Sequence, residues 1–184
     1  MNKTPVTVSP IPQTARIDLA AVDSRLGIKL EDEVGYWYPA DEQTAALTIY
    51  RKHYVRLAAT NTAALPGAEQ ALAAVRAAGD RAVIITAKHP ISVGPSLEAA
   101  GLTADEVFTH VHGPEKAAVL RRLAATAYVG DSPPDMAAAV EAGVRAVGVS
   151  TGSFGDRELY EAGADVVLDS LTGFPSWYRA LATA

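Results

Sequence analysis

From residue 68 to the carboxyl end, segments with helical composition alternate with short strand-like segments, and this alternation restricts the possible folds more than any other feature. The strand-like segments are continuous and rich in β-branched residues, as is usual for strands buried on both faces. They are AVIIT (82–86), EVFTHV (106–111), AYVG (127–130), RAVGVS (145–150) and ADVVLDS (164–170). Alternation of this kind predicts an α/β fold with a doubly wound parallel sheet.

The first third of the chain has a different pattern. Residues 13–64 contain stretches with the periodicity of amphipathic helices and no strand-like segment. We therefore expect a small helical cap formed by residues 13–64, and an α/β core formed by residues 1–12 and 65–184.

Composition excludes several classes of partner and chemistry. The formal net charge is −5 and no basic stripe is present, which argues against a nucleic-acid partner. The chain has no cysteine, so disulfides, thiolate metal sites and a cysteine nucleophile are excluded. No apolar run approaches the roughly 20 residues of a membrane-spanning helix, and the amino-terminal residues lack the apolar core of a signal peptide. We therefore expect a cytoplasmic protein with no membrane partner, whereas its oligomeric state stays open.

Polar side chains follow two of the predicted strands directly. Parallel sheets of this type bind ligands at the carboxyl ends of their strands. Asp131 follows Gly130 at the end of one strand, where a carboxylate is well placed for a hard cation such as Mg²⁺. Thr86 ends another strand, and its hydroxyl can donate a hydrogen bond to a phosphate oxygen. The two residues together point to a site for Mg²⁺ and phosphate.

Two further charged residues lie in the first turns of predicted helices. Asp135 stands three residues after Ser132, which is the spacing of a capping box, so a structural role explains Asp135 as well as a functional one does. Lys116 occupies a position where the helix macrodipole disfavours a cation. Its ammonium therefore either lies in solvent or meets an anion.

The sequence from about residue 65 to 184 resembles the Rossmann-like core of the haloacid dehalogenase-like hydrolases, especially the small members similar to phosphoglycolate phosphatase. The resemblance rests on five segments in the family's order: PGAEQALAAVRAAG, IITAK, GPEKAAVL, YVGDSPPDMAAAVEAG and ADVVLDSL. It implies hydrolysis of a small phosphorylated molecule with Mg²⁺. It further implies that Thr86 and Ala87 bind phosphoryl oxygens, that Lys116 holds nucleophile and phosphate together, that Asp131 binds Mg²⁺, and that Asp135 supports the catalytic site.

The resemblance also implies a nucleophile that this sequence lacks. In the family, the nucleophile is the first Asp of a D-x-D-x-T segment at the tip of the central strand, and the second Asp is the general acid/base. No D-x-D occurs in the 184 residues. If VTV (6–8) is the first strand, its tip is Ser9-Pro10 and carries no carboxylate. We therefore expect an incomplete or impaired phosphatase site, and a gap in the sheet that residues 5–9 fill at least in part.

Three alternatives stay open at this point. The alternative to an impaired phosphatase is a non-catalytic module that binds a phosphorylated ligand or a protein partner. His110 and His112 are two residues apart, so on a strand they would share one side and could ligate a metal. A dinucleotide-binding domain is disfavoured because no G-x-G-x-x-G follows an early strand.

Overall fold

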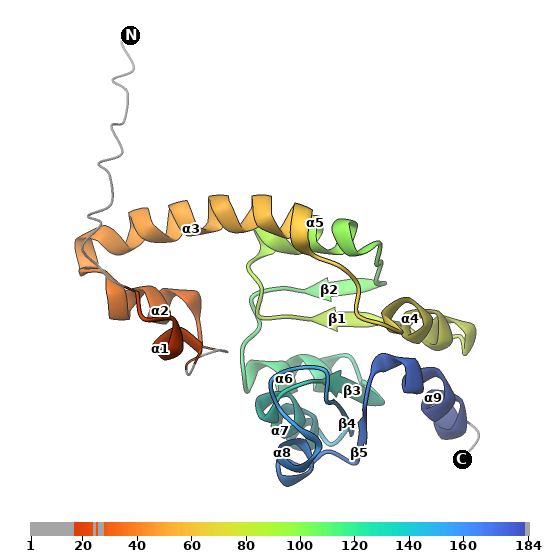
Figure 1. Cartoon of the computed structure of the whole chain (residues 1–184). Coiled ribbons are helices and arrows are strands. Elements are labelled where there is room, and N and C mark those ends of the chain that lie inside the picture. Colours follow the sequence, from red (N-terminus) through yellow and green to blue (C-terminus); the bar gives the residue numbers. More distant parts are fainter. Residues whose placement is uncertain (1–16, 24, 26–27, 183–184) are drawn as a thin grey trace.

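The computed structural model describes residues 17–23, 25 and 28–182, and strands and helices alternate along most of this length (Figure 1). Five strands are present in the described part of the chain, and each of their three pairings is parallel. They are β1 (Val83–Ile85), β2 (Glu106–Phe108), β3 (Ala127–Gly130), β4 (Arg145–Val149) and β5 (Val166–Leu168). The parallel strands and their connecting helices confirm the predicted α/β fold.

Each strand of this sheet is followed by a helix. The core helices are α4 (Ala68–Ala77), α5 (Pro90–Ala100), α6 (Glu115–Arg122), α7 (Pro133–Ala142), α8 (Asp156–Glu161) and α9 (Phe174–Ala182), with a short 3-10 turn η1 (Leu171–Gly173) before the last. Helix α5 connects the parallel strands β1 and β2, and helix α7 connects the parallel strands β3 and β4, so the carboxyl ends of paired strands lie at the same edge. That edge carries the loops that hold the predicted site residues.

Several strands are shorter than their sequence segments predict. Strand β2 ends at Phe108, although the pattern predicts a strand to residue 111. His110 adopts a left-handed backbone conformation with φ 59, which turns the chain out of the strand. His110 and His112 therefore belong to a loop, and the expectation that they share one side of a strand is wrong.

The best-packed part of the core lies around β4. Residues Met136, Ala139, Ala146 and Leu159 have no exposed surface, and they come from α7, β4 and α8. A second cluster joins α4 to α9 through Ala71, Phe174 and Tyr178. The alanine-rich sequence of α7 suits this position, because small side chains let the helix pack closely on the strands.

The helices before residue 62 lie beyond the carboxyl ends of the strands and along one side of the core. They are α1 (Leu19–Asp23), α2 (Leu30–Trp37) and the long α3 (Ala40–Asn61), whose last turns lie beside α5 (Figure 1). The division into a cap of residues 13–64 and a core stays a prediction, because its first residues lie outside the described part. No helix among the described residues has the length and apolar character needed to cross a membrane.

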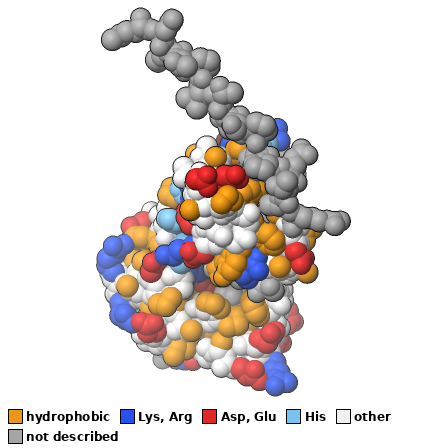
Figure 2. Space-filling view, turned by 90° about the vertical axis from the view of Figure 1, so that its left-hand side faces the viewer, with side chains coloured by type: hydrophobic (Ala, Val, Ile, Leu, Met, Phe, Trp, Pro, Cys, Tyr) orange, Lys and Arg blue, Asp and Glu red, His pale blue; other side chains and the backbone are white. Residues whose placement is uncertain are grey.

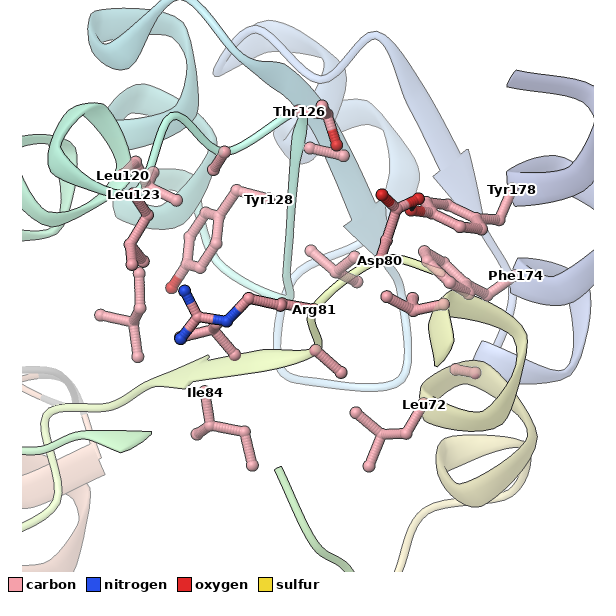
Figure 3. Close-up of a pocket in the computed structure, with 18 of the residues that line it drawn as sticks. Leu72, Asp80, Arg81, Ile84, Leu120, Leu123, Thr126, Tyr128, Phe174 and Tyr178 are labelled. Atoms are coloured by element: carbon pink, nitrogen blue, oxygen red, sulfur yellow. Dashed lines mark hydrogen bonds between the residues drawn. The ribbon is translucent and has the colours of Figure 1, made fainter. Parts of the chain in front are cut away.

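The sheet is interrupted in its middle. Among the described residues, β1 pairs only with β2, and β3 pairs only with β4, which gives the separate orders β1-β2 and β3-β4-β5. A cavity of about 590 Å³ separates β1 from β3 (Figure 3). The segment VTV (6–8), which the sequence suggests as a first strand, lies outside the described residues.

Candidate phosphate and magnesium site

The turn from β3 into α7 carries the two carboxylates singled out from the sequence. Asp131 comes directly after Gly130, the last residue of β3. Its side chain is exposed, and no hydrogen bond or ion pair to another described residue holds it. The loop after β4 lies against it, since a Cβ on Gly152 would stand only 2.6 Å from Asp131 Oδ2. Asp131 is thus a carboxylate that is positioned by the turn and open to a ligand.

Asp135 has the opposite environment. It is only 6% exposed, and its carboxylate accepts hydrogen bonds from three side chains. Lys116 Nζ lies 2.5 Å and Tyr128 Oη 3.0 Å from Oδ1, and Ser132 Oγ lies 2.7 Å from Oδ2. A buried carboxylate needs such partners, because burial penalises its charged form.

The capping-box interpretation of Ser132 and Asp135 is wrong. Ser132 is the N-cap residue of α7, but its side chain makes no capping hydrogen bond to the helix backbone. The hydroxyl instead donates to the Asp135 carboxylate, which the same turn of the helix brings within 2.7 Å. The carboxylate is used to hold Lys116 and Tyr128 in place, and the capping-box spacing is incidental.

The structure shows that the Lys116 ammonium meets an anion. It lies in the first turn of α6, and its ammonium meets the carboxylate of Asp135 rather than solvent. The side chains of Lys116 and Asp135 are 14% and 8% exposed, so the ion pair is largely shielded from water. An ammonium has three N–H donors, and Asp135 accepts from one of them.

Tyr128 belongs to the site, although nothing in the sequence singled it out. Its phenol donates to Asp135, and the Lys116 ammonium lies 5.9 Å from its ring centroid. Burial and the nearby Asp135 carboxylate raise the pKa of Tyr128, so its hydroxyl stays protonated and able to donate. Its position on β3 is the only signal that could have indicated this role.

Gly130 makes the close approach of Asp135 possible. A Cβ at Gly130 would lie 2.4 Å from the Asp135 Cβ and 2.7 Å from its Cγ. Any other residue at this position would therefore push the carboxylate away from Lys116.

Thr86 and Ala87 follow β1, on the far side of the gap in the sheet. The Thr86 hydroxyl accepts a hydrogen bond from the Lys88 backbone N–H at 3.1 Å, which leaves its own proton available for donation. Ala87 is exposed. Among the described residues, the Lys116 ammonium donates a hydrogen bond to Asp135, and no hydrogen bond joins Thr86 to Lys116, Asp131 or Asp135.

A second cavity, of about 420 Å³, adjoins the loops after β1 and β2. Its lining from α2 and α3 includes Glu31, Tyr50, Arg51 and Tyr54; its lining from the core includes Ala87, Lys88, His89, His110 and His112. Figure 2, which views the molecule from the side of α1 and α2, shows histidine side chains near Lys and Arg side chains. Both ring nitrogens of His112 and the Nε of Arg51 are buried there and have no hydrogen-bond partner among the described residues. The cavity therefore offers polar atoms to a ligand.

The three histidines pack ring against ring. The ring centroids of His89 and His110 are 5.6 Å apart, and those of His110 and His112 are 5.1 Å apart. Burial, followed by the charge of His110, lowers the pKa of His112, which favours a neutral ring. Within residues 17–23, 25 and 28–182, no group of three His, Asp or Glu residues is arranged to hold a metal ion. The structure thus gives no support to a metal site built on His110 and His112.

Two carboxylates on one turn nevertheless fit the requirements of Mg²⁺. This ion commonly takes one or two protein carboxylates and completes its octahedral shell with water and substrate phosphate. The partner-free Asp131 supplies the oxygen chemistry that Mg²⁺ prefers, and Asp135 lies one helical turn further on. The donor set therefore suits Mg²⁺ with phosphate better than it suits a closed structural metal site.

A parallel α/β fold with polar side chains after the carboxyl ends of its strands is typical of ligand-binding and catalytic α/β domains. A family model of the haloacid dehalogenase-like hydrolases matches residues 11–139. The chain belongs to this family.

Known proteins agree with the assignment. The plasmid-encoded phosphoglycolate phosphatase of Cupriavidus necator is 30% identical over 151 residues, which cover 75% of this chain and 65% of the relative. The match thus spans less than two-thirds of that relative's length. A haloacid dehalogenase-like hydrolase from Bacteroides fragilis superposes with a TM-score of 0.71 at 22% identity, over 85% of this chain and 82% of the other. A protein described as a predicted phosphoglycolate phosphatase from Haemophilus somnus gives a TM-score of 0.65 at 20% identity, over 77% and 68% of the two chains.

Proposed function

We propose that the chain forms the Mg²⁺- and phosphate-binding part of a phosphatase site that acts on a small phosphate monoester. The observation that carries the proposal is the cluster at the β3–α7 turn, where Lys116 and Tyr128 are bound to Asp135 and Asp131 stays open to a ligand. Its place at the carboxyl edge of a parallel sheet is where such folds bind ligands. The relationship to a phosphoglycolate phosphatase supports the same chemistry.

Each site residue has a distinct role in this proposal. Asp131 is a ligand of Mg²⁺, which neutralises charge on the phosphate. The Thr86 hydroxyl and the Ala87 backbone N–H donate to phosphoryl oxygens. Lys116 directs its remaining N–H donors to the phosphate, and Asp135 fixes the position of that ammonium. These groups stabilise the developing charge of phosphoryl transfer, in which most of the catalysis comes from positioning and electrostatics.

The substrate's leaving group lies in the 420 Å³ cavity between the helices before residue 62 and the loops after β1 and β2. Arg51, Lys88 and the three histidines supply donors to an oxygen-rich or anionic group there. A small phosphorylated metabolite is therefore the expected class of substrate.

Turnover by the 184-residue chain is expected to be impaired. The sequence contains no D-x-D segment to supply an aspartyl nucleophile and a general acid/base. Loss of a covalent nucleophile costs on the order of 10⁶ in turnover in another enzyme class, with residual catalysis from the remaining site. We expect p-nitrophenyl phosphate to be hydrolysed only at a trace level in the presence of Mg²⁺.

The test is a turnover assay of the purified chain beside Asp131→Asn. Trace activity in both proteins supports the impaired site. Robust activity in the parent chain that disappears in Asp131→Asn would show that another residue replaces the missing nucleophile, and Ser9 would be the first to substitute.

A non-catalytic module that binds a phosphorylated ligand is the second candidate, because the sequence has candidate anion-binding residues and no D-x-D segment. Isothermal titration with inorganic phosphate and Mg²⁺ distinguishes the two. Phosphate binding that is lost in Lys116→Met, together with no turnover of any ester tested, favours the binding module.

A further inference from the structure

The cavity of about 420 Å³ beside the loops after β1 and β2 has a largely apolar lining. Three of its lining residues are large apolar side chains that stay exposed, since Ile28, Tyr50 and Ile91 keep 41%, 47% and 55% of their surface in contact with solvent. The half-buried Leu30 and Tyr54 extend the same lining. Large apolar side chains gathered at one cavity are costly to leave in water and commonly mark a binding site, so the lining favours a ligand with an apolar body.

Buried polar atoms without partners concentrate at the same cavity. Among the described residues, four buried side-chain nitrogen or oxygen atoms have no hydrogen-bond partner, and three of them are the Nε of Arg51 and the two ring nitrogens of His112. A neutral imidazole carries one N–H and the Nε of a guanidinium carries another, so at least two donors stay unused. A buried donor without an acceptor is costly, and a ligand that brings an acceptor to these atoms is therefore favoured.

The charges of the lining favour an anionic acceptor. Arg51 and Lys88 are cations, and Glu31 is the carboxylate among the charged lining residues. Arg51 forms an ion pair with Glu31, whereas Lys88 donates to the neutral phenol of Tyr54 and forms no ion pair with any described residue. One positive charge therefore lacks a counter-ion, and hydrogen bonds from charged donors to a carboxylate are stronger than neutral ones.

The size of the cavity suits one ring with a short polar end. A volume of roughly 150 Å³ accommodates benzene in another protein, and small-molecule sites are generally apolar with a few placed polar groups. The volume of about 420 Å³ leaves room for a six-membered ring and a carboxylate.

We propose that the cavity binds the alcohol part of the substrate, and that this alcohol has an apolar body, such as an aromatic ring, that ends in a carboxylate. Tyr50, Tyr54 and Ile91 contact the body, and Arg51 and His112 donate to the carboxylate. The assignment of this group to a substrate rests on the proposed phosphatase function. The proposal narrows the substrate class to phosphate monoesters of such alcohols and disfavours small polyhydroxylated alcohols, for which the apolar lining offers few hydrogen-bond partners.

The test is the affinity of the full chain for four phosphonates, measured by isothermal titration with Mg²⁺. A phosphonate has a C–P bond in place of the ester oxygen, so the chain does not consume it during the titration. We expect benzylphosphonate to bind at least about tenfold tighter than methylphosphonate, because one methylene in an apolar pocket already changes affinity by about tenfold or more. (4-Carboxybenzyl)phosphonate should gain about a further tenfold from its charged hydrogen bonds. The polar 2,3-dihydroxypropylphosphonate should bind no tighter than methylphosphonate.

Variants locate these gains in the cavity. Tyr50→Ser and Ile91→Ser should each remove most of the gain that the ring provides, and His112→Leu should remove the gain that the carboxylate provides. The matched control Leu57→Ser takes an apolar side chain with 49% exposure from α3 outside the cavity, so it should bind all four phosphonates as the parent does. The affinities of the parent chain decide the proposal if a variant does not fold.

The outcomes separate this proposal from the proposed function. Equal parent affinities for methylphosphonate and both benzylphosphonates would overturn the proposal, as would tightest binding of the dihydroxypropyl compound or a ring gain that persists in both serine variants. Phosphate binding that depends on Lys116 would then still support the phosphatase site. Conversely, a chain that binds neither phosphate nor methylphosphonate, but binds 4-methylbenzoate in a manner that Tyr50→Ser abolishes, would overturn the phosphatase function and support the ligand class of the cavity. Absence of all of this binding would overturn both.

Discussion

At the scale of single residues, Asp131 and Asp135 show how two carboxylates on one turn acquire different roles. Asp135 is buried and held by three donors, so it organises Lys116 and Tyr128. Asp131 is exposed and has no partner among the described residues, so its oxygens are available to a cation. The difference comes from their positions: Asp135 is buried in the first turn of α7, whereas Asp131 directly follows strand β3 and is exposed.

The role of Asp131 predicts a specific metal response. Mg²⁺ at about ten times its dissociation constant should stabilise the chain by about 1.4 kcal/mol, which corresponds to a rise in Tm of roughly 3–5 °C. Asp131→Asn should abolish this rise, and Glu98→Gln, which removes an exposed carboxylate on α5, should retain it. Differential scanning fluorimetry with a Mg²⁺ titration measures the effect; equal shifts in all three proteins would remove Asp131 from the metal site.

The ion pair predicts strong energetic coupling between Lys116 and Asp135. Because both side chains are largely buried, removing one partner leaves an uncompensated charge, and Lys116→Met should lower the free energy of unfolding by roughly 3–5 kcal/mol. The double variant Lys116→Met/Asp135→Asn should lose less than the sum of the two single losses. Urea unfolding of the four proteins gives the coupling energy, and additive losses would show that the pair is not coupled.

At the scale of elements, the β3–α7 turn depends on a strand and a helix that approach closely. Gly130 allows α7 to begin against the end of β3, because any Cβ there would collide with Asp135. The alanines of α7 allow the same close packing further along, where Met136 and Ala139 are fully buried. The position of Asp135 therefore depends on close packing between α7 and β3 as well as on its hydrogen bonds.

Adding one methyl group at Gly130 tests whether the site depends on close packing between β3 and α7. Gly130→Ala should destabilise the chain by about 1–3 kcal/mol through overpacking, and it should weaken phosphate binding because Asp135 is displaced from Lys116. The matched change Gly94→Ala lies in α5 with nothing within 4 Å of the added Cβ, so it should stabilise the chain by up to about 1 kcal/mol. Thermal unfolding and phosphate titration separate the two; if Gly130→Ala behaved like Gly94→Ala, the close packing would have no energetic importance.

At the scale of the whole molecule, the cavity between the first helices and the core brings distant parts of the chain together. Arg51 of α3 and His112 after β2 contribute buried polar atoms that have no hydrogen-bond partner in the described part of the chain. Both His110 and Lys29 add positive charge near His112, whereas Glu115 and Glu31 oppose it. Burial, together with these nearby charges, lowers the pKa of His112, so the cavity favours a neutral imidazole ring.

The lowered pKa of His112 predicts that the free energy of unfolding decreases as the pH falls. Because the pKa of His112 is lower in the folded chain than its ordinary value of about 6.5, the unfolded chain binds the proton first as the pH falls. The stabilising contribution is present above pH 6.5 and is lost as the pH falls through the folded pKa. Urea unfolding at pH 7.5, 6.5 and 5.5 should show a smaller acid loss in His112→Leu than in the parent chain. The exposed His53→Gln should follow the parent, and identical pH profiles for all three proteins would contradict the assignment to His112.

The sequence by itself determined the class of fold, and it indicated candidate site residues that stay predictions. Alternating helical and strand-like segments are local patterns, so they indicated the parallel α/β sheet, and strand β3 was predicted with its exact limits, 127–130. Asp131 and Thr86 were predicted as site residues because the carboxyl ends of parallel strands are known binding positions, and the structure places both directly after strands or at their ends. The predicted limits of β2 and β5 were less accurate, because a turn such as the one at His110 depends on tertiary contacts.

Only the tertiary structure decided what these residues contact. Lys116 and Asp135 are 19 residues apart, and Asp80 and Tyr178 are 98 apart, so no periodicity connects them. The partners of Asp135, the histidine-lined cavity and the gap between β1 and β3 all arise from packing between segments distant in sequence. Local sequence patterns specify which helix or strand forms. Burial and close packing between distant segments specify which side chains contact one another, and the chemistry of this site depends on those contacts.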